Sequence, residues 1–260
     1  MSTLTTSAGD TITYDRYGPA DAPGALFIAG AGPTRADDPV TTETARLLGE
    51  SGVQAVVHDR VGRGDSPAAG PISLERELAA ITALAATMPG PVVLVGHSSG
   101  CAIAMIAARE VPNLGGLVLW EAPLGQFPEG APAWWAGVAA HISAGRLEDA
   151  VAAYMVGMPP EWLDELRRSP AYPGLIQSWI PDGTALARVE EDGVAACLHG
   201  IAAPVLAVVG TETFPGMAEA ADAIADAAAA GASESLAGAW HSWDPAAMSA
   251  RLVAFVRDGR

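Results

Sequence analysis

A five-residue stretch in the middle of the chain, Gly-His-Ser-Ser-Gly at 96–100, has the residue types and spacing of a nucleophilic serine. It matches the pattern G-x-S-x-G with Ser98 at its centre. An apolar run precedes it and a helix-forming run follows it, so we expect a tight turn between a strand and a helix. Glycines permit that turn because they lack the Cβ atoms that would clash there. We therefore interpret Ser98 as a catalytic nucleophile rather than as a helix N-cap.

Several features along nearly the whole chain resemble the α/β-hydrolase fold enzymes. The serine motif lies mid-chain, Asp-Arg-Val-Gly-Arg-Gly-Asp-Ser-Pro at 59–67 follows an earlier predicted strand, and a histidine lies near the C-terminus. A cap-like insertion follows the predicted strand that ends in Leu-Val-Leu-Trp-Glu-Ala-Pro at 117–123. The resemblance implies that the 59–67 loop is mainly structural, so Asp59, Arg60 and Arg63 are not expected to be catalytic.

A serine hydroxyl is a weak nucleophile until an imidazole removes its proton, and the chain has five histidines. His97 lies inside the serine motif, beside the nucleophile rather than facing it. The family's order along the chain, serine then acid then histidine, implies that the base is His241, in the loop before the last predicted helix. The alternative is a loop histidine between two packing tryptophans.

The acid is where the chain departs from the family. Most members carry an aspartate three residues after the final glycine of the strand that corresponds to 203–210, and that position is Thr213 here. Glu212 and Glu121 are the two carboxylates that could replace it. Glu121 directly follows four apolar strand residues, where a charge is costly to bury unless it is paired, and it would lie one strand from Ser98. We favour Glu121, with Glu212 as the alternative acid.

Acyl transfer also needs N–H donors for the oxyanion. One is expected from Ser99, the residue after the nucleophile. The resemblance implies a second donor from the loop after the strand at 25–30, where many members carry His-Gly. This chain has Ala-Gly-Ala-Gly at 29–32, so the second donor is predicted to be the N–H of Ala31, with Gly30 bordering the substrate.

Large apolar side chains of the predicted insertion favour an apolar pocket for an acyl chain or a ring, although packing of the insertion on the core is the alternative for each of them. In addition to Gly30, the predicted substrate-binding residues are His97, Phe127, Trp134, Trp135, Met155, Met158 and Trp179.

The elements that must position these groups alternate between strands and helices. Strands are predicted at 11–18, 25–30, 53–59, 91–95 and 115–123, and helices at 40–52, 74–88 and 101–111. The connections are too short for anything but parallel neighbours, and right-handed crossovers then give an α/β fold with a doubly wound, mostly parallel sheet.

That alternation is interrupted between 124 and 200 by proline-broken helical pieces without a convincing strand. It resumes with a strand at 203–210, a helix at 217–230, a weak strand near 233–238 and a helix at 245–257. We therefore predict a core formed by 1–123 and 201–260, with a helical lid inserted at 124–200.

Composition excludes several classes of protein. Half of the residues are hydrophobic, only 17% are charged, and the formal net charge is −16. The acidic excess disfavours nucleic acid and anionic membranes as partners. No apolar run reaches a membrane-spanning length and the N-terminus lacks the features of a signal peptide, so a cytoplasmic location is expected. Cys101 and Cys197 are interpreted as reduced core residues, and no cofactor or metal is predicted, because no phosphate loop, dinucleotide fingerprint or metal-ligand cluster is visible.

Together these features predict a cofactor-independent serine hydrolase. It would cleave a carboxylic ester, lactone or thioester of a largely apolar small molecule through an acyl-enzyme on Ser98. The alternative is non-hydrolytic chemistry on the same scaffold, namely C–C bond cleavage or lyase, cyclase or perhydrolase activity. A binding protein on this scaffold is disfavoured by the intact serine and histidine. The sequence leaves open whether the chain is a monomer or a homodimer.

Overall fold

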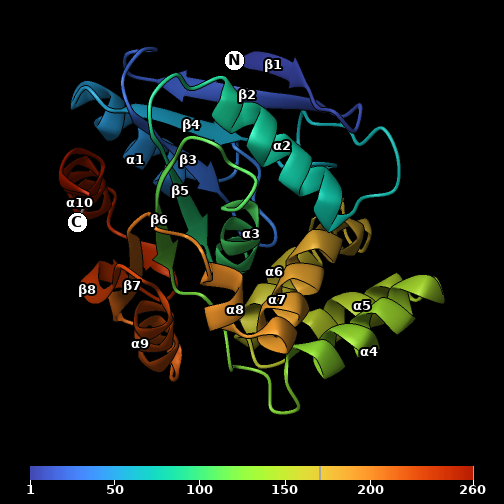
Figure 1. Cartoon of the computed structure of the whole chain (residues 1–260). Coiled ribbons are helices and arrows are strands. Elements are labelled where there is room, and N and C mark those ends of the chain that lie inside the picture. Colours follow the sequence, from blue (N-terminus) through green and yellow to red (C-terminus); the bar gives the residue numbers. More distant parts are fainter. Residues whose placement is uncertain (170, 260) are drawn as a thin grey trace.

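The computed structural model describes residues 1–169 and 171–259. Its centre is one sheet, in which the described strands follow the order β1-β2-β4-β3-β5-β6-β7-β8-β9 (Figure 1). The strands are β1 Ser2–Thr5, β2 Thr11–Tyr17, β3 Gly24–Ile28, β4 Gln54–His58, β5 Val92–His97, β6 Leu114–Trp120, β7 Val205–Glu212, β8 Gly231–Ala239 and β9 Ser242–Trp243. Pairing is parallel from β4 through β8 and antiparallel at both margins. The predicted doubly wound, mostly parallel sheet is confirmed.

Helices cover both faces of this sheet, with α1 and α10 on one side and α2 and α3 on the other (Figure 1). The core helices are α1 Pro39–Glu50, α2 Leu74–Ala86, α3 Gly100–Ala107, α9 Met217–Ala227 and α10 Pro245–Asp258. Because both faces are covered, β3 and β4 are buried along their whole length and contain runs of apolar residues. The carboxyl ends of β3, β5, β6 and β7 therefore meet at one edge of a rigid sheet.

Between β6 and β7 the regular elements of the described residues are all helices, joined by loops. They are α4 Ala131–Ser143, α5 Leu147–Tyr154, α6 Pro160–Leu166, the 3-10 helix η1 Gly174–Trp179, α7 Ile180–Asp192 and α8 Val194–Leu198. This segment, called the insertion below, has its own small apolar core around Tyr154 and Trp179. Its α7 also packs into the main core through Ala185, Leu186 and Val189. None of the helices in residues 1–169 and 171–259 is long and apolar enough to cross a membrane.

The structure differs from the sequence-based prediction at the margins of the sheet and at the end of one helix. The strands β1 and β9 were not predicted, because four mostly exposed Ser, Thr and Leu residues and a two-residue strand carry no apolar period. Antiparallel pairing with β2 and β8 forms them instead. The helix predicted at 101–111 is shorter, since α3 ends at Ala107. Cys101 and Cys197 are free and buried, as predicted.

Candidate active site

The turn that holds Ser98, called the Ser98 turn (96–100) below, connects β5 to α3. Ser98 has a φ of 55°, a left-handed conformation that is unfavourable for a side chain. A Cβ at Gly100 would lie 2.3 Å from the carbonyl oxygen of Ile28, and one at Gly96 would lie 2.7 Å from the Cα of Cys101. Both glycines are therefore required by close backbone approach, and the turn presents Ser98 above the end of β5.

Glu121 follows the strand next to β5. His97 pairs with Trp120 in the parallel register of β5 and β6, so the residues that come next, Ser98 and Glu121, lie at the same sheet edge. The Glu121 side chain is fully buried, and its Oε2 lies 2.7 Å from Nδ1 of His241. The structure thus brings together Glu121 and His241, which are 120 residues apart in the sequence.

The Glu121 carboxyl is held in its ionised form. Burial raises its pKa, but the hydrogen bond from His241, together with that from the Gly210 N–H at 3.0 Å, outweighs burial and lowers it. Thr213, at the position where an aspartate was expected, has a buried hydroxyl without a hydrogen-bond partner in the described part of the chain. Glu212 is exposed at the end of β7, so of the two glutamates only Glu121 is paired with His241.

His97, predicted to border the substrate, supports His241 from within the core. Its Nε2 donates to the carbonyl oxygen of His241 at 2.8 Å, and the two rings are 4.8 Å apart. The Trp120 indole N–H donates to the same carbonyl at 3.3 Å. Burial, followed by the neighbouring charge of His241, lowers the pKa of His97 to about 4. His97 is therefore neutral near pH 7 and holds the His241 loop in place.

The two predicted oxyanion donors lie together beside the Ser98 turn, but one is engaged. The Ala31 N–H donates to the hydroxyl of Ser99 at 3.1 Å, whereas the Ser99 N–H has no acceptor among the described residues. Gly30 is close to Ser98, since a Cβ at Gly30 would lie 2.8 Å from the Ser98 Cβ. The Ser99 hydroxyl donates in turn to Asp182 at 2.7 Å.

Asp182, at the start of α7, was missed by sequence reasoning. It is completely buried and pairs with Arg60 through Oδ1 at 2.6 Å and with Arg63 through Oδ2 at 2.8 Å. These three residues are called the Arg–Asp cluster below. Asp59 instead accepts from the backbone N–H groups of Asp65, in its own loop, and of Arg35, in the segment between β3 and α1. Nothing in the local sequence around Asp182 distinguishes it from a solvent-facing acid in a first helical turn.

Two further residues that were not predicted lie against His241. The ring of Trp162, from α6, is 6.5 Å from the imidazole, and the ring of Phe214, after β7, is 6.3 Å from it. Trp240 packs on Phe214 and remains 59% exposed. The only signal in the sequence was aromatic content, because the contacts join three separate segments.

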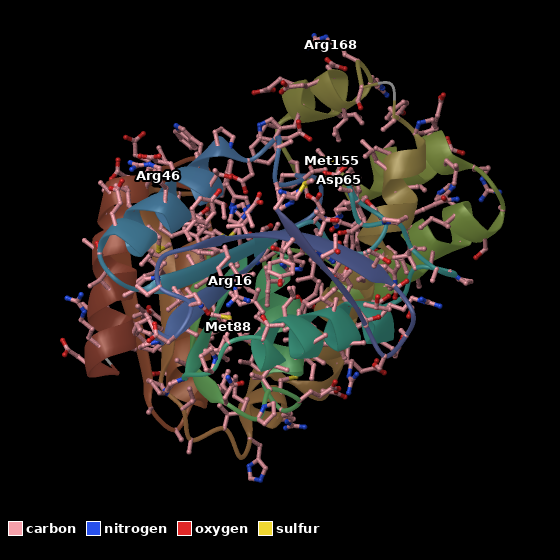
Figure 2. All side chains as sticks on the ribbon, turned by 90° about the horizontal axis from the view of Figure 1, so that it is seen from above. Arg16, Arg46, Asp65, Met88, Met155 and Arg168 are labelled. Atoms are coloured by element: carbon pink, nitrogen blue, oxygen red, sulfur yellow. The ribbon has the colours of Figure 1, made fainter. Side chains whose placement is uncertain are left out.

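The Phe, Trp and Met residues predicted to border the substrate pack against other residues of the insertion. Trp134 stacks on Phe127 with ring centroids 4.2 Å apart, and Trp135 packs on Gly183. Met155 (labelled in Figure 2) and Met158 are partly buried against the insertion's core. Trp179 is only 1% exposed and packs on Tyr154 within that core, so it stabilises the insertion rather than lining an open surface.

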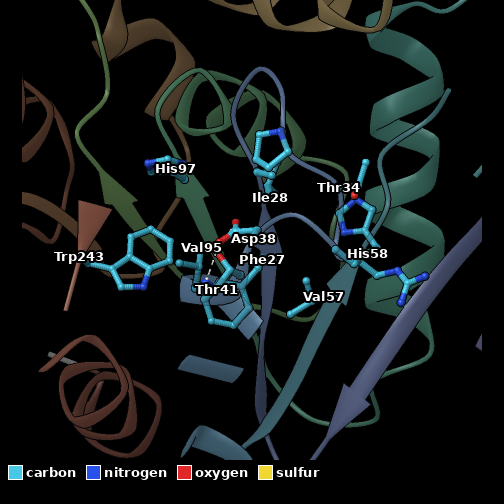
Figure 3. A pocket seen from close by; sticks show the side chains of 13 residues that line it. Phe27, Ile28, Thr34, Asp38, Thr41, Val57, His58, Val95, His97 and Trp243 are labelled. Atoms are coloured by element: carbon cyan, nitrogen blue, oxygen red, sulfur yellow. Dashed lines mark hydrogen bonds between the residues drawn. The ribbon is translucent and has the colours of Figure 1, made fainter. Parts of the chain in front are cut away.

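A small cavity lies behind His97 (Figure 3). It is lined by β3, β4 and β5 and the segment that leads into α1, with Trp243 at one end and His58 at the other. Its volume is about 10 Å³, roughly the space of one water molecule, so it is too small for a substrate. Burial lowers the pKa of His58 to about 3.

Within the described residues, no group of three His, Cys, Asp or Glu side chains could hold a metal ion.

Comparisons with known proteins agree with this architecture. A model described as "Alpha/beta hydrolase family" matches residues 25–255, and no curated protein matches the chain. An alpha/beta hydrolase from Sphaerobacter thermophilus is similar at 26% identity, covering 98% of this chain and 99% of that one, with a TM-score of 0.78. A thermophilic esterase from Thermogutta terrifontis is similar at 19% identity, covering 99% of this chain and 98% of that one, with a TM-score of 0.64. A thioesterase domain from the curacin biosynthetic pathway has 20% identity, coverage of 98% of each chain, and a TM-score of 0.67.

Proposed function

Because the chain belongs to the alpha/beta hydrolase family, we propose that it is a serine hydrolase acting through an acyl-enzyme on Ser98. Its substrate is a carboxylic ester, lactone or thioester of a largely apolar small molecule. The observation that supports this most directly is the 2.7 Å contact between Glu121 Oε2 and His241 Nδ1, one strand away from a serine held on a strained turn. The esterase and thioesterase neighbours carry out chemistry of the same class.

The charge pair determines which nitrogen of His241 reacts. A carboxylate accepts a hydrogen bond from Nδ1–H, so the neutral imidazole carries its hydrogen on Nδ1 and keeps a lone pair on Nε2. Nε2 then removes the Ser98 hydroxyl proton while Oγ attacks the substrate carbonyl carbon. Glu121 stabilises the resulting imidazolium and fixes its orientation, the role of the acid in serine triads.

The remaining steps follow from the same groups. The tetrahedral intermediate carries its negative charge on the former carbonyl oxygen, which the N–H groups of Ser99 and Ala31 stabilise. The imidazolium of His241 returns its proton to the leaving oxygen or sulfur as that bond breaks. A water molecule, deprotonated by His241, then attacks the acyl group and releases the acid from Ser98.

The aromatic rings on His241 favour an apolar leaving group. The leaving atom must come within hydrogen-bond distance of His241 Nε2 to receive the proton. Whatever packs on that imidazole therefore packs next to the leaving group, and Trp162 and Phe214 do so. Apolar rings gain free energy by excluding water from an apolar alcohol or thiol.

Covalent labelling tests the proposal. The intact mass is measured after treatment with a fluorophosphonate, from which Ser98 Oγ displaces fluoride. We expect one adduct on the wild type, none on Ser98→Ala, and slowed labelling of Glu121→Gln. Glu212→Gln, one residue from the expected acid position, is the matched control and should label at the wild-type rate. An unlabelled wild-type protein would overturn the proposal and favour non-hydrolytic chemistry.

A further inference from the structure

We infer that Asp182, contributed by the insertion, is a positioning residue for the oxyanion hole and acts through the hydroxyl of Ser99 and the guanidinium groups of Arg60 and Arg63. This inference rests on the proposed function and adds to it a requirement for the insertion. The insertion would then take part in stabilising the transition state without touching the reacting atoms.

The first step is the peptide unit that joins Gly30 to Ala31. Nη1 of Arg63 donates to the Gly30 carbonyl oxygen at 2.6 Å, and Nη1 of Arg60 donates to it at 3.3 Å and to the Ala29 oxygen at 3.0 Å. In a planar trans peptide the C=O and N–H bonds point in opposite directions. Holding the Gly30 oxygen therefore sets the direction of the Ala31 N–H, the predicted oxyanion donor.

The second step is the Ser99 hydroxyl. Its oxygen accepts from the Ala31 N–H at 3.1 Å, and its single proton is donated to Asp182 Oδ1 at 2.7 Å. Because a hydroxyl has one proton, this bond leaves Oγ as an acceptor toward Ala31. Ser99 thus supplies one oxyanion donor from its own N–H and holds the other in place with its side chain.

The third step is electrostatic. Asp182 accepts from both guanidinium groups as well as from Ser99, and the side chains of Arg60, Arg63 and Asp182 are at most 2% exposed. In such a dry site the two cations strongly polarise the Gly30 carbonyl, which makes the N–H of the same peptide a better donor. The Ala31 N–H is therefore held beside the Ser99 N–H before the substrate binds, and it is shared between Ser99 Oγ and the oxyanion as the negative charge develops.

The composition of the cluster also favours positioning over stability alone. Arg60 Nη2 and Arg63 Nε are buried and have no partner within the described part of the chain. An unpaired buried donor lowers stability, and apolar replacements of buried ion pairs are often neutral or stabilising. Apolar side chains would attach α7 to the core at least as well, but they could not orient a carbonyl and a hydroxyl.

The test uses Ser99→Ala and Asp182→Asn in the full-length chain. We expect kcat for an aryl ester to fall about 10- to 100-fold, with KM changed less than about threefold. Affinity for a trifluoromethyl ketone, which forms a tetrahedral adduct on Ser98, should fall by the same factor as kcat/KM. Ser99→Thr, which keeps the hydroxyl, should recover most of the loss.

Asp10→Asn is the matched control, because Asp10 is also completely buried and pairs with an arginine, Arg76, at 2.7 Å, but it lies between β1 and β2 at the margin of the sheet. The melting temperature shows whether Ser99→Ala is folded. The inference is wrong if folded Ser99→Ala and Asp182→Asn lower kcat no more than Asp10→Asn does. If Asp182→Asn does not fold, Ser99→Ala and Ser99→Thr decide. If the wild type is labelled by the fluorophosphonate but kcat of Ser99→Ala and of Asp182→Asn is unchanged, only this inference is refuted. If the wild type is not labelled, the proposed function is refuted as well.

Discussion

The Glu121–His241 pair and the Arg–Asp cluster both adjoin the Ser98 turn, and they differ in whether a group that can exchange a proton remains partly exposed. In the pair, Glu121 holds Nδ1 of His241, while the imidazole stays 16% exposed and its Nε2 is left for another partner. In the cluster, both oxygens of Asp182 are bound by guanidinium groups and the Asp182 side chain is completely buried. An imidazole with a free nitrogen can take up and release a proton, whereas a buried carboxylate bound by two guanidinium groups holds geometry. Substitutions should therefore separate activity from stability.

The largest expected effect is on the pair. His241→Asn removes the base and leaves the Arg–Asp cluster unchanged, so kcat for an aryl ester should fall about 10⁴- to 10⁶-fold. The melting temperature should stay within a few degrees of the wild type, since the side chain is partly exposed. Steady-state kinetics and a thermal melt on the same sample measure both quantities. A large loss of stability would show that the pair, too, holds the fold together.

The next effect is on the cluster. Arg60→Met leaves Asp182 and Glu77 each without one partner in a buried site, so the free energy of unfolding should fall by about 3–5 kcal/mol. Urea denaturation measures it. Arg46→Met is the control, since Arg46 pairs with Glu43 and Glu50 on the exposed face of α1, and its denaturation midpoint should not move. Equal midpoints for the two variants would contradict the comparison.

A pH series gives a smaller effect that belongs to the pair alone. The pKa of Glu121 is lowered in the folded protein, so its carboxylate contributes stability above the usual pKa of a glutamate, and that contribution is lost as the pH falls through the lowered folded value. The stability difference between the wild type and Glu121→Gln should shrink as the pH falls below about 4. Urea denaturation at each pH tests this, and a difference independent of pH would contradict it.

The smallest effect concerns Trp162, which touches His241 from α6. No residue of α6 is buried, and Arg168, just beyond it, projects outward (Figure 2). Trp162→Ala should change the free energy of unfolding by less than about 1 kcal/mol and raise KM a few-fold for aryl esters but not for methyl esters. Trp179→Ala, in the insertion's core, should instead destabilise by about 3–5 kcal/mol. Similar stability losses would show that α6 is anchored as firmly as the insertion's core.

The parts of this molecule that could be predicted are those whose signal is local. Strands buried on both faces, such as β3 and β4, need continuous apolar runs, and the Ser98 turn needs glycines on both sides of the serine. Glu121 was identifiable because an acid directly after an apolar strand must find a partner. Asp182 was not, because its role depends on α7 packing against a loop 122 residues away in the sequence.

The same distinction explains the oxyanion loop. Alignment by position identified the Ala31 N–H as a donor, but its bond to the Ser99 hydroxyl depends on a side-chain rotamer and on a partner from the insertion. Trp162 and Phe214 were missed for a similar reason, since an aromatic residue in a helix or loop does not indicate which ring it will contact. Contacts between segments that fold separately leave no periodic trace in the sequence.

The ion pairs of Asp182 with Arg60 and Arg63 also limit how this protein could be re-engineered. The chain enters and leaves the insertion at two points, which invites exchange of residues 124–200 between relatives to change specificity. A graft that brought the carboxylate without its two arginines, or the arginines without it, would leave buried charges unpaired beside the Ser98 turn. The unit that can be exchanged therefore includes the loop that carries Arg60 and Arg63, and recombination libraries should cross over outside both segments.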